Sequence, residues 1–260
     1  MAVTRPRGPR SGDDLPDGVR LVPVVPGILD DDPSDPGRNA QRALGDCWLI
    51  ATIDALMETA DGRTRLRAGI RWDAAARGYR VRLHDRMGRP RIVLVTRVLQ
   101  GCAGLDDGGQ GIVSLYEAAA YALYGWNGAR SHLPSFGVRA LTNTRTFTRV
   151  RLAGRISHAA VKSGGSAGGG VSLAGTRPLW PWEAKRIVPA RRMPSGGTFE
   201  VSVEPDHVYE IVDIRGGLIG LRNPWGPGNT ADGGGVFYVT RGVFDAAFFG
   251  VTGTKVTGLG

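Results

Sequence analysis

The sequence has few of the residues that would point to several common classes of protein. Only two of its 260 residues are cysteines, Cys47 and Cys102, and they lie far apart, so no disulfide framework is expected. No apolar run approaches the roughly 18 residues that a membrane-spanning helix needs. Residues 1–18 are polar and rich in Pro and Gly, without the apolar segment of a signal peptide. We therefore expect a cytoplasmic protein, or one exported without a classical signal peptide, and no membrane partner.

Lysine is also scarce. Three of the 33 basic residues are lysines and the rest are arginines, and the formal net charge is +9. Many of the arginines lie in residues 61–100. A solvated basic face explains this run most simply, and an acidic partner surface is the functional alternative. Because no nucleic-acid-binding motif accompanies the charge, nucleic acid is not the expected partner. Nothing in the sequence indicates an oligomeric state.

What the sequence does contain is a cysteine at the start of an apolar, helix-like run. Residues 41–50 read QRALGDCWLI, and apolar residues continue at helical spacing, which predicts a helix over 47–60 with its apolar face in the core. A thiol at a helix N-terminus meets the positive end of the helix dipole, which favours the nucleophilic thiolate. Taken alone, however, a cysteine on an apolar helix is more often a small buried hydrophobe.

Two short β-rich runs far downstream contain candidate partners for this thiol. They read HVYEIVDI at 207–214 and LIGLRNPW at 218–225, and a Gly-Gly pair lies between them. This pattern predicts a β-hairpin. We assume that Ile214 opposes Leu218, and a slip of one residue from that register would turn every later side chain to the other face of the sheet.

In this register Tyr209 opposes Asn223, and His207 opposes Trp225. His207, Asn223 and Trp225 then share one face of the hairpin, with His207 and Asn223 on a diagonal of roughly 7–8 Å. Asn223 can accept a hydrogen bond from one imidazole nitrogen, which leaves the other nitrogen for the thiol. Trp225 can cover that hydrogen bond. The single residues have ordinary alternatives, since a strand histidine is often structural and Asn-Pro commonly starts a turn.

Together these motifs resemble the catalytic core of calpain-type cysteine peptidases, a branch of the papain-like group. The resemblance rests on QRALGDCWL at 41–49, HVY at 207–209 and RNPWG at 222–226. It covers roughly residues 37–250, strongly at the three motifs and weakly between them. It implies a minimal, bacterial form of this core.

The resemblance implies a role for each residue of the motifs. Cys47 is expected to be the nucleophile, His207 the general base and acid, and Asn223 the residue that orients the histidine. Gln41 and the Cys47 N–H are expected to form the oxyanion hole, with Trp225 in support. The pair of Cys47 and His207 is expected to rest partly as thiolate and imidazolium. The implied activity is an endopeptidase that cleaves protein or peptide substrates through a thioester acyl-enzyme, without a cofactor.

The implied fold is α+β and papain-like, with the site between two lobes. Residues 1–36 are expected to form a disordered or loosely packed lead-in. Residues 37–145 are expected to form a mainly helical lobe with the cysteine, and residues 146–260 an antiparallel β lobe with the histidine and asparagine.

The sequence departs from the calcium-dependent members of the family. Those enzymes place a calcium-binding aspartate nine residues before the nucleophile, where this chain has Arg38. In the stretch after Asn223 this chain has only Asp232, where the calcium-dependent enzymes have several acidic calcium ligands. We therefore expect a calcium-independent enzyme with no metal site. Two other classes stay open: a papain-like binding module without activity, and a basic protein that binds nucleic acid or an acidic surface.

Local patterns predict several further elements, namely strands at 79–83, 92–95, 171–173 and 199–203 and a buried helix at 115–124. The resemblance implies a closing strand at 236–239 and a short helix at 243–244. The Gly/Ser-rich residues 163–170 lack the ending of a phosphate-binding loop and are expected to be a surface loop. Trp180 and Trp182 are expected to form a substrate wall or to pack in the core. No catalytic or metal-binding role is expected for the remaining residues of suitable chemistry, which are Cys102, His84, His132 and His158.

Overall fold

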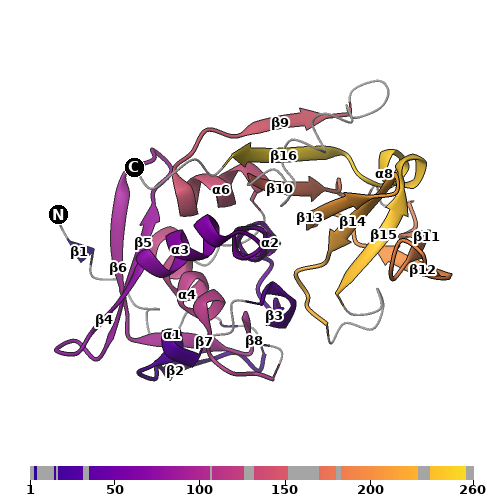
Figure 1. The fold of residues 1–260 in the computed structure, drawn as a ribbon. Coiled ribbons are helices and arrows are strands. Elements are labelled where there is room, and N and C mark those ends of the chain that lie inside the picture. Colours follow the sequence, from indigo (N-terminus) through magenta and orange to yellow (C-terminus); the bar gives the residue numbers. More distant parts are fainter. Residues whose placement is uncertain are drawn as a thin grey trace.

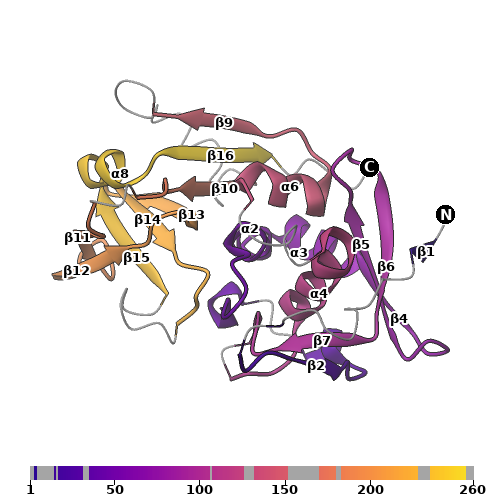
Figure 2. The same cartoon turned by 180° about the vertical axis from the view of Figure 1, so that it is seen from behind.

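The computed structural model describes residues 3–4, 15, 17–31, 35–105, 107–125, 132–151, 170–179, 183–227 and 235–255. Helices and mostly antiparallel sheets alternate in the described chain, so the fold is α+β, as predicted. One core lies among the N-terminal helices and strands, and a second lies in the C-terminal sheet. Figures 1 and 2 show these two parts side by side, with helix α2 (Cys47–Met57) between the other helices and the large sheet.

Helix α2 is the central element of the N-terminal part. All of its residues are buried, because it packs against helices on one side and against the sheet on the other. The predicted helix over 47–60 is too long, since Thr59 caps a separate helix with its hydroxyl. The other helices are α1 (Ile28–Asp31), the 3-10 helix η1 (Pro36–Arg38), α3 (Ala60–Ala68), α4 (Ile112–Tyr124), α6 (Pro134–Thr142) and α8 (Arg241–Ala247).

The C-terminal part is an eight-stranded sheet in the order β12-β11-β15-β14-β13-β10-β16-β9. Its strands are β9 (Phe147–Val150), β10 (Gly170–Gly175), β11 (Arg186–Arg191), β12 (Thr198–Val203), β13 (Val208–Arg215), β14 (Leu218–Arg222), β15 (Val236–Thr240) and β16 (Gly250–Lys255). Alternate residues of the central strands serve the two cores: Leu173 and Val208 face α2, whereas Ala174 and Tyr209 belong to the second core. One face of the sheet is thus part of the first core.

The N-terminal part also has strands of its own. A four-stranded sheet in the order β1-β6-β5-β4 and two short pairs, β2-β7 and β3-β8, pack around the helices. These strands are β1 (Val3–Thr4), β2 (Arg20–Pro23), β3 (Asn39–Ala40), β4 (Ile70–Asp73), β5 (Gly78–His84), β6 (Pro90–Val95), β7 (Arg97–Gln100) and β8 (Gly104–Leu105). The strands expected at 79–83 and 92–95 are therefore present as the antiparallel pair β5 and β6.

The expectation of a loose lead-in over residues 1–36 is wrong for much of that stretch. Strand β2 pairs with β7, and Val24 and Ile28 are buried in the first core. The Ile28 N–H donates to the Tyr79 hydroxyl at 3.0 Å. The apolar residues of this stretch are few and are separated by prolines, so the sequence did not indicate that Val24 and Ile28 belong to the core. The expected boundary at 145/146 falls in the connection between α6 and β9.

Some expectations lie outside the described residues. This holds for Trp180, Trp182, His158, Asp232 and residues 163–169. Of the remaining expected elements, the helix at 115–124 is the C-terminal part of α4, and the short helix at 243–244 is part of α8. Among the described residues, no helix is long and apolar enough to cross a membrane.

Candidate active site

Cys47 is the first residue of α2, and its side chain is turned toward the sheet. The residue is 6% exposed, and the backbone N–H of Val208 donates to its sulfur. Val208 is the first residue of β13 and directly follows His207. The thiol therefore lies where the N-terminus of α2 meets the beginning of β13, one residue from the predicted base.

His207 and Asn223 are in direct contact, as predicted from the hairpin. The His207 Nε2 atom lies 2.8 Å from Asn223 Oδ1. The same Oδ1 accepts the Trp225 backbone N–H at 3.1 Å, which identifies this atom as the oxygen of the amide. Because an oxygen can only accept, Nε2 carries the proton of the neutral imidazole. The lone pair of Nδ1 is then available to take a proton from a thiol.

The register of the hairpin differs from the assumed one near the turn and agrees with it near the site. Ile214 pairs with Ile219 rather than with Leu218. An irregularity between Ile211 and Asp213 then shifts the pairing by one residue, so that Glu210 opposes Arg222. The pairing beyond that point is the one assumed from the sequence, and His207 and Asn223 share a face for this reason.

The backbone around His207 is fixed from the neighbouring strand β10. The Thr176 hydroxyl accepts the His207 N–H at 2.9 Å and donates to the Glu204 carbonyl at 2.8 Å. The Thr176 N–H donates to the His207 carbonyl at 2.9 Å. Asp206, just before the histidine, has a φ of 49°, a left-handed conformation that aspartate tolerates better than most residues. Thr176 gave no signal in the sequence, because its role depends on the pairing of two distant strands.

The ring of His207 is enclosed by two aromatic side chains. Its centroid lies 5.0 Å from that of Trp225 and 4.9 Å from that of Tyr209. Only 6% of His207 and 1% of Asn223 are exposed. Trp225 therefore packs against the imidazole, and the burial of His207 and Asn223 limits the competition of water for the hydrogen bond between them.

Gln41 lies in the loop that leads to Cys47, and its side-chain amide is partly engaged. Its Nε2 donates to the Leu44 carbonyl at 2.7 Å, which closes the loop before α2. The second hydrogen of this NH2 group is the one that an oxyanion would require. The Gln41 backbone N–H donates to the Pro224 carbonyl at 2.7 Å, so the loop that contains Gln41 is attached directly to the loop that contains Asn223.

Burial dominates the ionisation of the candidate pair. It raises the pKa of the Cys47 thiol to about 12 and lowers the pKa of His207 to about 4. The pair therefore rests as a thiol and a neutral imidazole in this closed conformation, not as the expected ion pair. The helix dipole is outweighed because the sulfur is nearly out of contact with water.

The two halves of the site are held together by contacts between the two parts of the molecule. Arg222 on β14 binds Glu58, just after α2, and Glu210 on β13, each at 2.7 Å. Gly226, with a φ of 83°, packs so closely against β3 that a Cβ atom there would lie 2.6 Å from the Asn39 carbonyl oxygen. These residues were not singled out in the sequence, where an arginine and two glutamates on separate elements carry no common pattern.

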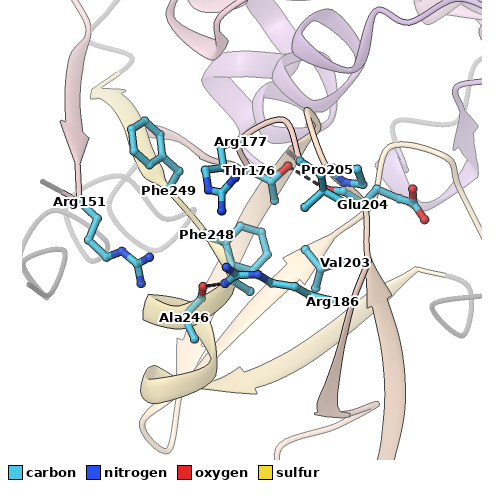
Figure 3. A pocket seen from close by; sticks show the side chains of 12 residues that line it. Arg151, Thr176, Arg177, Arg186, Val203, Glu204, Pro205, Ala246, Phe248 and Phe249 are labelled. Atoms are coloured by element: carbon cyan, nitrogen blue, oxygen red, sulfur yellow. Dashed lines mark hydrogen bonds between the residues drawn. The ribbon is translucent and has the colours of Figure 1, made fainter. Parts of the chain in front are cut away.

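A small pocket is lined in part by Thr176, the residue that binds the His207 backbone. Figure 3 shows the side chains of Arg151, Arg177 and Arg186 around it, near Phe248. Its volume is about 30 Å³, room for about two water molecules and not for a peptide. A larger cavity of about 270 Å³ opens beside the loop of Gln41, lined by Arg42, Cys102, Ala103, Gly104, Gln110 and Ser114.

The described residues contain no cluster of three or more histidine, cysteine, aspartate or glutamate side chains that could hold a metal ion. Arg38 makes an ion pair with Asp107 at 3.1 Å. His132 packs against Phe136 and Trp48, and His84 bonds to the Ala140 carbonyl, so both have structural contacts. Cys47 and Cys102 are both free thiols.

No protein-family model matches the chain, and no curated protein shows a significant match to it.

Proposed function

We propose that this chain is a cysteine endopeptidase with a papain-like, calpain-type catalytic core. The observation that carries the proposal is the contact of His207 Nε2 with Asn223 Oδ1 at 2.8 Å. Val208, the residue after His207, lies with its backbone N–H at the Cys47 sulfur. A nucleophile, a base and a residue that orients the base are the three parts of a catalytic triad. The arrangement on α2 and on the β13–β14 hairpin supports two papain-like lobes.

The mechanism follows from the tautomer of His207. Its Nδ1 takes the proton of the Cys47 thiol as the sulfur attacks a peptide carbonyl. The Cys47 backbone N–H and the second N–H of Gln41 stabilise the oxyanion. His207 then protonates the leaving amine, and a thioester remains. Water attacks the thioester after His207 removes its proton, and the acid and the free thiol are released.

Because Cys47 and His207 rest as a thiol and a neutral imidazole, we infer that substrate binding helps to form the thiolate. Proton transfer from Cys47 to His207 creates two charges in a buried site, which is unfavourable until something stabilises them. A bound peptide brings its carbonyl to the oxyanion donors, so the negative charge passes to an oxygen that is already hydrogen-bonded. We therefore infer that the thiolate forms during attack rather than at rest.

The proposed enzyme does not need calcium. Arg38 occupies the position where calcium-dependent members of the family have an aspartate, and its guanidinium already pairs with Asp107. A cation at this position would repel a calcium ion.

Labelling with an epoxide inhibitor of cysteine peptidases tests the proposal. Wild type, Cys47→Ala and Cys102→Ala are treated with and without a calcium chelator, and cleavage of a casein substrate is followed in parallel. We expect labelling and cleavage that need Cys47, do not need Cys102 and persist with the chelator. Loss of both signals with the chelator would overturn calcium independence. Equal labelling of the Cys47→Ala variant would overturn the assignment of the nucleophile.

One observation favours a second candidate, a papain-like binding module without activity. Cys47 and His207 are each only 6% exposed, so the structure gives a substrate little access to the thiol. This candidate predicts neither labelling nor cleavage even with calcium present, while a folded protein is still seen by circular dichroism. The experiment above separates the two candidates.

A further inference from the structure

Two carboxyl groups lie side by side beneath the candidate thiol site. Asp46 directly precedes Cys47, and Glu117 lies in the middle of α4. Both residues are 0% exposed, and their carboxyl groups lie close enough for each to shift the pKa of the other. Asp46 is the N-cap of α2, a position where an aspartate usually accepts an N–H of the first turn. Its carboxyl makes no such bond, because it is turned toward Glu117 instead.

The hydrogen-bond donors around this pair do not suffice for two carboxylates. Glu117 Oε1 accepts the Ala103 N–H at 2.9 Å. The other three oxygens, Oε2 of Glu117 and both of Asp46, are buried without a protein donor at hydrogen-bond geometry. Among the residues that the structure describes, no basic side chain forms an ion pair with either group. Two adjacent buried carboxyls in this situation hold a proton, because both cannot be ionised at such a distance.

The surroundings decide which residue holds the proton. The Asp46 N–H and the Gln41 amide lie close to Asp46 and lower its pKa, against a larger rise from burial that brings it to about 7. Burial and the charge of Asp46 raise the pKa of Glu117 well above its ordinary value. In the geometry of the pair, Glu117 Oε1 accepts the Ala103 N–H while Oε2 has no donor, so Oε2 is the oxygen that can carry the shared proton toward Asp46.

We propose that Glu117 is a positioning residue for the thiol site: as a neutral carboxylic acid it donates a hydrogen bond to Asp46 and so fixes the loop from Gln41 to Cys47. This proposal rests on the proposed peptidase function for its effect on catalysis. Asp46 lies next to the Cys47 N–H and beside the Gln41 amide, the two donors of the proposed oxyanion hole. A free Asp46 carboxylate would compete with an oxyanion for the Gln41 N–H. A hydrogen bond from Glu117 satisfies that carboxylate, so the Gln41 N–H stays available to the oxyanion.

Few other titratable groups face the pair. Cys47 approaches from α2, and Cys102 from the turn after β7. Burial raises the pKa of both thiols, so both stay neutral at physiological pH. The pair and its proton therefore set the local charge at the start of α2.

The test compares Glu117→Gln with Glu117→Leu. Glutamine keeps a neutral donor of the same shape, whereas leucine removes the donor and leaves Asp46 unpaired. Asp54→Asn is the matched control, since Asp54 is a second fully buried acid on the same helix. Three properties are measured at pH 7: the infrared carbonyl band of protonated carboxylic acids, the rate of alkylation of Cys47 by iodoacetamide resolved from Cys102 by mass spectrometry, and kcat and KM for peptide cleavage.

We expect the protonated-acid band of the wild type to lose the contribution of one carboxylic acid in Glu117→Gln, while the other buried acids with raised pKa values, Asp54 and Glu210, still contribute to it. Glu117→Gln should alkylate Cys47 and cleave peptide within about threefold of wild type. Glu117→Leu should lower kcat by roughly ten- to a hundredfold with KM little changed, the effect of one hydrogen bond to a charged group. Asp54→Asn should leave kcat near the wild-type value.

An unchanged infrared band in Glu117→Gln would overturn the proposal, because Glu117 would then be ionised. Equal kcat in the glutamine and leucine variants would overturn its positioning role. The infrared comparison needs only the glutamine variant, so it remains decisive if the leucine variant does not fold. A wild type that cleaves no peptide would contradict the proposed function alone, since the infrared band and the alkylation rate would still test the carboxyl pair.

Discussion

Two buried acidic clusters lie at the two ends of helix α2, and they are neutralised in different ways. At the N-terminus Asp46 faces Glu117, and no described basic side chain is paired with them. Near the C-terminus Asp54 and Glu58 lie beside Glu210, around the guanidinium of Arg222. The first cluster relies on protons alone and stays within one part of the molecule. The second also has a cation, Arg222, which joins the two parts.

Removal of the cation should have the largest effect on this comparison. In Arg222→Leu the buried acids of the C-terminal cluster lose their compensating charge, and the free energy of unfolding should fall by about 3–5 kcal/mol in urea titrations. Both ion pairs use the same guanidinium nitrogen, Nη1, so Arg222→Lys keeps the charge but loses the planar guanidinium, and it should lie between leucine and wild type. A loss below about 1 kcal/mol in Arg222→Leu would indicate that this cluster, too, is neutralised by protons.

The pH dependence of stability should reveal both clusters. Burial raises the pKa of Asp46 and Asp54 to about 7 and that of Glu210 to about 8 in the folded protein. The folded state then binds more protons than the unfolded state, so this stability is fully present below about pH 4 and is lost as the pH rises through 7 to 8. His207, with its lowered pKa, acts in the opposite direction only below about pH 6.5.

We therefore expect the free energy of unfolding to fall by about 1–3 kcal/mol between pH 6.5 and pH 8. Urea titrations across this range give the measurement. Stability that rises with pH over the same range would mean that the buried acids are already ionised in the folded protein at pH 6.5.

Neutral substitutions should separate the two ends of the helix. Asp54→Asn removes a carboxyl group that faces Arg222 and is partly ionised at pH 7, and it should lower the free energy of unfolding by about 1–2 kcal/mol at this pH. Asp46→Asn should cost less than about 1 kcal/mol, because its amide can still accept from Glu117 and can donate to the unpaired Gln41 Oε1. Equal losses in thermal and urea unfolding would remove the distinction between the clusters.

The smallest effect is expected at Glu58. Its side chain is 22% exposed, so water already compensates much of its charge. Glu58→Gln should change the free energy of unfolding by less than about 1 kcal/mol, within the range of partly exposed ion pairs. A loss comparable with that of Arg222→Leu would show that Glu58, rather than Glu210, is the main partner of the arginine.

The candidate site shows how much of its geometry could be predicted from the sequence. The hairpin pattern brought His207 and Asn223 to one face, although the assumed pairing of Ile214 with Leu218 was wrong. A local irregularity before Asp213 restored the assumed register at the site. A bulge of this kind depends on packing on both faces of the sheet, so no pattern of residues predicted it. The pairing near the site matches the assumed one because the irregularity compensates for the one-residue error at the turn.

The predicted charge state of the site shows a limit of local reasoning. The sequence placed Cys47 at a helix N-terminus, which favours a lower thiol pKa. The tertiary structure buries the thiol between α2 and β13, and burial raises the pKa to about 12 instead. Desolvation depends on everything that surrounds a group, and a window of ten residues contains little of that information.

The sequence by itself predicted the candidate site residues and determined the short elements that hold them. The apolar helix after Cys47, the strands of the hairpin and the order of Gln41, Cys47, His207 and Asn223 all follow from local patterns. Only the tertiary structure decided how charges are balanced around them. Glu117 meets Asp46, and Arg222 meets Glu58, across separations of 71 and 164 residues in the chain (117 minus 46 and 222 minus 58). Such pairs form where packing excludes water from both partners, and that condition belongs to the folded chain as a whole.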